Sequence, residues 1–271
     1  TRTWNAICAI ATMSRAIALA RDYAYRRQAF GAHLIDQPLH ARTLADMQAE
    51  FEGAFSLAFY VAELLGRTEQ GAASPRDTAL LRLLTPLAKL WTAKASIAVV
   101  SEALECFGGA GYIEDTGLPQ LLRDAQVYAI WEGTTNVLSL DMLRALGVGG
   151  VAPLRETIAT LVPAGSDALR PIHAALDATE ALLGDIAADR GALEASARGI
   201  AFTLARTMAA ALLVRSAGWG EAAGDGRPMA ACRRFIARGL DRLFLPEGED
   251  DAMLAQDRPS EPTARKVRAA M

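Results

Sequence analysis

Apolar residues recur every three or four positions through most of this 271-residue chain, and this spacing constrains the fold more than any other feature. Such a spacing buries one face of a helix. It predicts four long helices, over residues 2–30, 39–65, 76–107 and 137–146. Pro86 predicts a kink in the third, because an interior proline removes one backbone donor. Four helices with short connections form an all-α, up-down helical bundle.

Helical patterns continue beyond a glycine-rich break at Gly147, Gly149 and Gly150. They predict an additional C-terminal helical layer, with helices over residues 152–162, 167–187, 189–217 and 228–245. We therefore divide the chain into a bundle (1–148), an additional helical region (149–246) and a loosely ordered tail (247–271) that is poor in apolar residues. The chain begins on Thr1 already in helical register, so we expect it to be part of a longer protein.

The composition excludes several classes of protein. The net charge of −3 is spread over both halves, so neither half is a polycation. We find no convincing strand, and no apolar run reaches the ~18 residues that cross a bilayer, so we expect no membrane partner. Three isolated cysteines predict reduced thiols and a cytoplasmic protein, and three scattered histidines predict no metal site. These residues are Cys8, Cys106 and Cys232, and His33, His40 and His173.

The segment Ala129–Val137 places one carboxylate, Glu132, just before a turn and a new helix. The helix start carries hydroxyl and amide groups and presents free N–H donors to an anion. Glu132 is then either a catalytic base beside an anionic ligand or a solvated side chain beside an ordinary helix cap. The residues of this segment alone leave both interpretations open.

Two further motifs are also ambiguous. Gly108–Tyr112 is rich in glycine but follows a helix, so it is not a dinucleotide fingerprint; it either caps that helix or lets a flat ligand approach the backbone. Arg26 and Arg27 end the first predicted helix, where guanidiniums complement the helix dipole or hold a pyrophosphate. Arg123 and Asp124 could form a surface ion pair.

Together these motifs resemble the C-terminal helical domain of FAD-dependent acyl-CoA dehydrogenases. The resemblance covers residues 1–146 and rests on Tyr23–Gly31, Phe107–Tyr112 and Arg123–Thr134, which occur in the family's order and spacing. Trp131, Leu34–Leu39 and the additional helical region are similar to the AidB-type branch, which is associated with the response to DNA alkylation. The resemblance implies dehydrogenation of an acyl-CoA thioester, in which a base removes the α-proton and FAD accepts a hydride.

The resemblance also implies a role for particular residues. The catalytic base is Glu132, the FAD contacts are Arg27, Phe30, Gln37, Gly109, Thr134 and Asn136, and the acyl-CoA contacts are Arg2 and Gly133. Arg27 and Phe30 would reach the FAD of a neighbouring subunit, so we expect a homodimer or homotetramer. Two positions depart from the family, because Glu105 replaces a glutamine and Ala29 replaces a hydroxyl residue. The resemblance names neither the acyl-chain length nor the electron-transfer partner.

A second hypothesis is an AidB-type, DNA-associated flavoprotein with weak dehydrogenase activity. Five arginines fall on the helix predicted over 228–245 or just before it: Arg227, Arg233, Arg234, Arg238 and Arg242. Phosphate contacts need such clusters, but a solvated helix face gives the same pattern, and the acidic chain disfavours nucleic acid. A helical interaction module is a third hypothesis, and it leaves the three family motifs unexplained.

Overall fold

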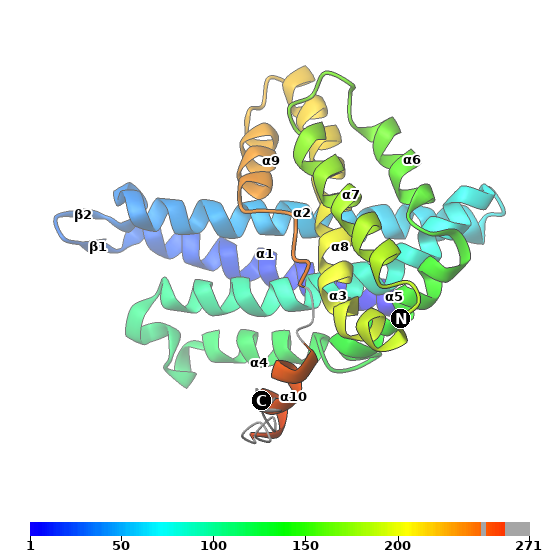
Figure 1. The fold of residues 1–271 in the computed structure, drawn as a ribbon. Coiled ribbons are helices and arrows are strands. Elements are labelled where there is room, and N and C mark those ends of the chain that lie inside the picture. The colour runs from blue at the N-terminus through cyan, green and yellow to red at the C-terminus, as the bar shows by residue number, and fades with distance from the viewer. Residues whose placement is uncertain (245–247, 258–271) are drawn as a thin grey trace, which may run out of the picture.

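The computed structural model describes residues 1–244 and 248–257 and confirms the all-α fold. Four helices lie lengthwise side by side, and a fifth continues from the turn after the fourth (Figure 1). They are α1 (Arg2–Arg26), α2 (Pro38–Glu69), α3 (Pro75–Glu105), α4 (Leu118–Tyr128) and α5 (Thr135–Gly149). Between α3 and α4 lie two short 3-10 helices, over Gly108–Gly111 and Glu114–Thr116, and a third precedes α2 at Leu34–Asp36.

The start of α3 illustrates how the sequence sets a helix boundary. Ser74 accepts a hydrogen bond from the Asp77 backbone at 3.1 Å, and Asp77 accepts one from the Ser74 backbone at 2.9 Å. This reciprocal pair satisfies two donors that a helix start leaves free, and Pro75 occupies the first position. The donors from Ser74 hold the pKa of Asp77 below its ordinary value. The helix then continues through Pro86 to Glu105 without a break.

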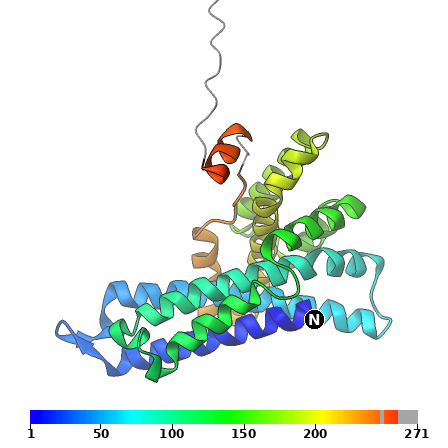
Figure 2. The ribbon, with the colours of Figure 1, turned by 90° about the horizontal axis from the view of Figure 1, so that it is seen from below.

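A second group of helices stands at a steep angle to the bundle, as Figures 1 and 2 show from two directions. It consists of α6 (Ala152–Leu161), α7 (Leu169–Asp185), α8 (Arg190–Ala222) and α9 (Arg227–Ala237). The central helix, α8, packs against α2, α3 and α5 of the bundle as well as against α6, α7 and α9. One continuous apolar core therefore joins the two groups.

Two predicted helix boundaries were wrong, and helix α4 was not among the predicted helices. The first helix ends at Arg26 and not at Phe30, because a two-stranded hairpin, β1 (Gln28–Ala29) and β2 (Ala32–His33), follows it. The last long helix ends at Ala237 and not at 245, because Gly239 adopts a left-handed backbone with φ 86°. Part of the predicted tail, Gly248–Gln256, forms helix α10. Residues 247 and 258–271 of that tail lie outside the described residues.

Two helices, α3 and α8, are long and apolar enough to cross a membrane by length and composition. The sequence prediction missed them because it counted uninterrupted apolar runs, whereas a few charged side chains interrupt these helices. In each helix 78% of the most apolar window is buried inside the protein. Their apolar composition is therefore used in packing against neighbouring helices.

Candidate active site

Glu132 lies in the turn between α4 and α5 with its side chain exposed. Its backbone is left-handed, with φ 59°, and Gly133 follows with φ 106°. A residue with a side chain rarely adopts this conformation, which costs about 1–2 kcal/mol per residue. Among the described residues, the others with side chains that share it are Phe30 and Asp257. Two of the three are thus residues for which the family resemblance implies a role, and strained backbone tends to cluster at functional sites.

The turn is tied to the bundle from two sides. From α1, the Asn5 side chain donates a hydrogen bond to the Tyr128 carbonyl at 3.2 Å, and the Thr12 and Tyr128 hydroxyls lie 3.0 Å apart. From α3, the Lys89 ammonium donates a hydrogen bond to the Gly133 carbonyl. Asn5 and Lys89 are both buried in the bundle core. The position of Glu132 is therefore set by side chains from helices distant in sequence.

Several charged side chains interact with one another near this turn. Arg2 and Arg82 both bind the Asp141 carboxylate, at 2.5 and 2.7 Å. Hydrogen bonds from Arg82 and then Arg2 hold the pKa of Asp141 below its ordinary value, although burial opposes the shift. Burial lowers the pKa of Lys89 to about 8, and repulsion from Arg2 adds to this while attraction to Glu132 opposes it. Arg2, Lys89 and Glu132 are therefore within electrostatic reach of one another.

The start of α5 presents the polar groups that the sequence predicted. Thr134 occupies the cap position, but its hydroxyl makes no capping hydrogen bond. Asn136 is exposed and accepts a long hydrogen bond, 3.5 Å, from Arg198 of α8. The first N–H groups of a helix have no acceptor within the helix. The helix start is therefore open to an anionic or carbonyl ligand beside Glu132.

A second cluster lies at the opposite end of α1. The hairpin turn consists of Phe30, with φ 51°, and Gly31, with φ 84°, and the Phe30 ring is 98% exposed. Gln37 donates a hydrogen bond to the Ala29 carbonyl at 3.2 Å, which ties the start of α2 to this hairpin. Arg26 is paired with Asp22, whereas Arg27 forms no ion pair within the part of the chain that the structure describes. Arg27 therefore keeps an uncommitted guanidinium.

A groove of about 390 Å³ runs beside this hairpin. It is lined by Phe30, Leu34, Gln37, Leu39, His40, Thr43, Glu102, Glu105 and Cys106. The His40 Nε2 atom is buried and has no hydrogen-bond partner among the described residues, and burial raises the pKa of the Cys106 thiol to about 11. The groove is thus lined by the amide of Gln37 and the carboxylates of Glu102 and Glu105, but it offers no reactive thiolate.

The predicted site residues therefore form two clusters. Arg2, Gly133, Thr134 and Asn136 lie near Glu132, whereas Arg27, Phe30 and Gln37 follow the C-terminal end of α1. Figure 1 shows α5 and the hairpin β1–β2 at opposite ends of α1. The helix between them has 25 residues, or about 37 Å at about 1.5 Å per residue. Gly109 lies in the 3-10 helix after α3 with open space around its Cα, while Gly111 is held against the Leu104 carbonyl, where no side chain fits.

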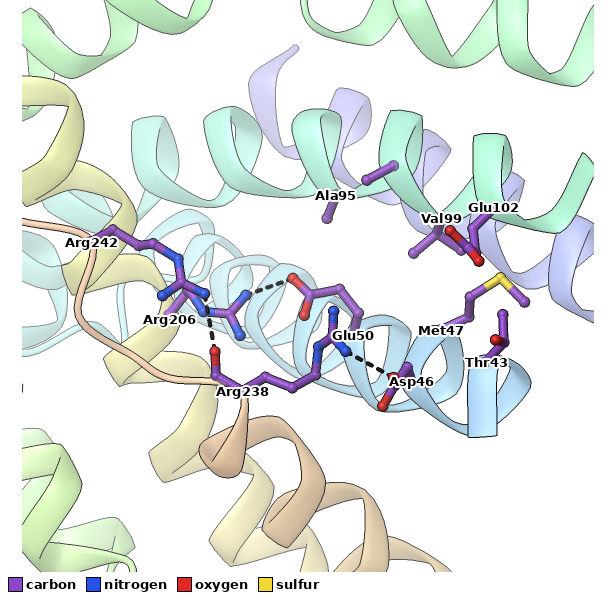
Figure 3. A pocket seen from close by; sticks show the side chains of 11 residues that line it. Thr43, Asp46, Met47, Glu50, Ala95, Val99, Glu102, Arg206, Arg238 and Arg242 are labelled. Atoms are coloured by element: carbon purple, nitrogen blue, oxygen red, sulfur yellow. Dashed lines mark hydrogen bonds and ion pairs between the residues drawn. The ribbon is translucent and has the colours of Figure 1, made fainter. Parts of the chain in front are cut away.

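The five arginines do not lie together on one helix as predicted. Arg238 and Arg242 lie beyond the end of α9, and Asp46 of α2 pairs with Arg234 and Arg238 at 2.7 and 2.8 Å. Arg242 donates to the carbonyls of Asp241 and Arg238. Figure 3 shows Asp46, Arg238 and Arg242 among the side chains that line a pocket between α2, α3 and α8, and the volume of this pocket is about 460 Å³. Arg234, Arg238 and Arg242 thus make contacts with other groups of the protein, although Arg238 and Arg242 stay exposed. The Asp46 carboxylate offsets part of their charge, which weakens the case for a phosphate-binding surface.

Sequence reasoning missed Lys89 and Asp141 because both lie in helices whose pattern was interpreted as packing alone. The available signal was a lysine within a long apolar helix, flanked by Ala88 and Leu90. Arg123 pairs with Glu114 at 2.9 Å and not with its neighbour Asp124. Across residues 1–244 and 248–257, no three His, Cys, Asp or Glu side chains lie close enough to hold a metal ion.

Comparison with known proteins gives family matches over both parts of the chain. Residues 1–147 match "Acyl-CoA dehydrogenase, C-terminal domain", and residues 157–246 match "Acyl-CoA dehydrogenase 11 C-terminal domain-like". Acyl-CoA dehydrogenase family member 11 of Caenorhabditis elegans is 42% identical in an alignment of 232 positions that covers 79% of this chain and 37% of that protein. The putative acyl-CoA dehydrogenase AidB of Escherichia coli is 40% identical over 136 residues, 50% of this chain and 24% of that protein.

A solved structure extends the similarity to nearly the whole chain. The crystal structure of Caenorhabditis elegans ACDH-11 in complex with C11-CoA aligns with a TM-score of 0.87 and 36% identity. The alignment covers 96% of this chain and 47% of that one, so the chain spans less than half of the relative's length. The chain belongs to the acyl-CoA dehydrogenase family, and its first 147 residues match that family's C-terminal helical domain.

Proposed function

We propose that this chain supplies the catalytic base and one wall of the active site in an FAD-dependent acyl-CoA dehydrogenase. The observation that carries the proposal is the geometry of Glu132, an exposed carboxylate on a turn with a left-handed backbone. Hydrogen bonds from Asn5 of α1 and Lys89 of α3 hold this turn in place. In the family motif that residues 123–134 resemble, the catalytic base occupies the position of Glu132. ACDH-11 was crystallised in complex with C11-CoA, which supports an acyl-CoA thioester as the substrate of the present chain.

In this proposal the Glu132 carboxylate removes the α-proton of the bound acyl-CoA thioester. Bound FAD supplies the redox chemistry, because flavin accepts the hydride that leaves the β-carbon. The N–H groups at the start of α5 lie beside the base and stabilise negative charge. A carboxylate deprotonates carbon well only where water is excluded. Ile130, Trp131 and Val137 surround Glu132 with exposed apolar side chains that substrate, flavin or a further domain would cover.

The second cluster fits the adenine end of FAD. The uncommitted guanidinium of Arg27 suits a pyrophosphate, and the exposed Phe30 ring offers a face for stacking. The Gln37 amide lines the groove beside the hairpin and offers a polar contact to a base. Glu105 lies in the same groove, where a carboxylate accepts hydrogen bonds from an amino group but disfavours phosphate.

Because α1 separates the two clusters by its full length, we propose that each serves a different active site. Arg27 and Phe30 would then contact the FAD held mainly by a neighbouring subunit, which requires a homodimer or homotetramer. The three free cysteines support a cytoplasmic location for the protein.

The experiment that tests the function is an absorption titration of the whole protein that carries this chain. We expect bound flavin, and bleaching of its visible band when a matching acyl-CoA is added without air. A panel from short to long acyl chains identifies the substrate class. Flavin that no acyl-CoA of the panel reduces would contradict the proposal, and so would a whole protein that binds no flavin.

A further inference from the structure

Lys89 is a charged side chain inside the apolar core of the bundle. It lies in the middle of α3 and is 1% exposed, with the buried residues Leu87, Ala88 and Leu90 beside it in the sequence. Removing an ammonium from water costs several kcal/mol unless the protein supplies partners. A side chain that only fills space here would be apolar, so the partner of Lys89 indicates what its charge does.

That partner is the turn that carries Glu132. The Lys89 ammonium donates a hydrogen bond to the Gly133 carbonyl, and none of the described carboxylates lies within ion-pair distance of it. Hydrogen bonds from a charged donor are about twice as strong as neutral ones. The contact therefore fixes the carbonyl of Gly133, the residue that directly follows Glu132. The left-handed backbone of this turn needs such support from outside the turn.

We propose that Lys89 is the positioning residue of the active site, which holds the Gly133 carbonyl and thereby directs the Glu132 carboxylate toward the substrate. The inference rests on the proposed function for the role of Glu132, but the contact itself does not. With the carbonyl fixed, Glu132 and Gly133 keep their φ angles of 59° and 106°. Without it, Glu132 relaxes toward the ordinary right-handed or extended region and its carboxylate turns away.

The charged groups around Lys89 make this support dependent on pH. Arg2 faces it from α1 and Glu132 from the turn. Arg2 is itself paired with Asp141 of α5, which also binds Arg82 of α3. Burial keeps the pKa of Lys89 at about 8. Below that pH the ammonium makes a charge-assisted bond, and above it the neutral amine makes a weaker one. Flavin reduction should therefore decline above about pH 8.

The first test measures amide hydrogen exchange in the 271-residue chain, which needs neither flavin nor substrate. Lys89→Met keeps the length and removes the donor, and Lys94→Met is the matched control, because Lys94 lies five residues further along α3 and is not tied to the turn. We expect exchange in peptides over residues 129–137 to rise at least about tenfold in Lys89→Met, as for a lost restraint of about 1.4 kcal/mol. Peptides from α8 should keep their rates.

The wild-type chain gives the same answer if Lys89→Met does not fold. After correction for intrinsic rates, protection over residues 129–137 should fall between pH 7 and pH 9.5 while α8 stays protected. Unchanged protection of the turn, either in a folded Lys89→Met or across this pH range, overturns the inference.

The second test separates the inference from the proposed function. In the whole protein, Lys89→Met should slow flavin reduction by about 10- to 100-fold, as misplaced catalytic groups do, with little change in acyl-CoA affinity. Its rate should also lose the decline near pH 8, and Lys94→Met should behave as wild type. If Glu132→Gln abolishes reduction while Lys89→Met reduces flavin at the wild-type rate, the positioning role fails and the proposed function stands. If Glu132→Gln reduces flavin normally, the proposed function fails.

Discussion

Replacing Glu50 by Leu should strongly destabilise the protein, because it leaves a buried guanidinium without its counterion. Arg206 of α8 is 6% exposed at its side chain and binds Glu50 of α2 at 2.6 Å (Figure 3). Burial lowers the pKa of Arg206, and the attraction of Glu50 opposes this shift. The guanidinium also lies 4.3 Å from the Phe235 ring centre and donates to the Gly239 carbonyl at 3.0 Å. The pair thus joins the bundle to the additional helical layer.

Removing one partner of a buried ion pair costs about 3–5 kcal/mol, and because Glu50 keeps 18% exposure we expect the lower end, about 3 kcal/mol. Urea unfolding followed by circular dichroism measures this difference. The double variant Glu50→Leu/Arg206→Met should recover most of the loss, since an apolar pair of similar volume is often as stable. Glu194→Gln, in an exposed pair with Arg190, should cost under about 0.5 kcal/mol. A loss for Glu50→Leu as small as for Glu194→Gln would refute the reasoning.

Three further predictions concern the site and its supports. Arg27→Ala should lower the flavin content of the whole protein after gel filtration, and an unchanged flavin content removes Arg27 from the site. The same variant of the flavin-free 271-residue chain should keep its unfolding midpoint, because no described carboxylate pairs with Arg27. Gly111→Ala should destabilise the chain by about 1–3 kcal/mol in urea, because a Cβ there meets the Leu104 carbonyl, and a neutral effect contradicts this packing. Asp141 has a lowered pKa, so its stabilising effect is present above about pH 4 and is lost as the pH falls through its folded pKa. Asp141→Asn should therefore make the free energy of unfolding less dependent on pH in that range, and an unchanged pH dependence refutes this prediction.

The helical bundle could be predicted because its signal is local. Apolar spacing indicates which face of α1, α2 or α3 is buried, and Ser74 and Pro75 mark where α3 begins. The hairpin after α1 could not be predicted, because Phe30 disfavours the left-handed backbone that it adopts. Helical spacing that continued up to Gly31 extended the predicted helix by four residues, to Phe30.

In the candidate site, too, the residues with a local sequence signal could be predicted and those that depend on packing could not. Motifs in sequence located Glu132, Thr134 and Asn136 at one turn and the helix start that follows it, because these residues are neighbours in the chain. Lys89 reaches that turn from α3, and Asp141 is linked to α1 and α3 through Arg2 and Arg82. Packing alone brings these side chains together. The arginine cluster failed as a prediction because Gly239 ends the helical path and Asp46, nearly two hundred residues earlier, captures Arg234.

The role of Glu132 as the base is the central claim, and rapid mixing of the whole protein with acyl-CoA tests it most directly. The Glu132→Gln variant keeps the size of the side chain and loses the basic oxygen, and Asp124→Asn is a matched control at an exposed carboxylate of α4. We predict that Glu132→Gln retains its flavin and reduces it at least about 10²- to 10⁴-fold more slowly, whereas Asp124→Asn matches wild type. Reduction of flavin by Glu132→Gln at the wild-type rate would contradict the account.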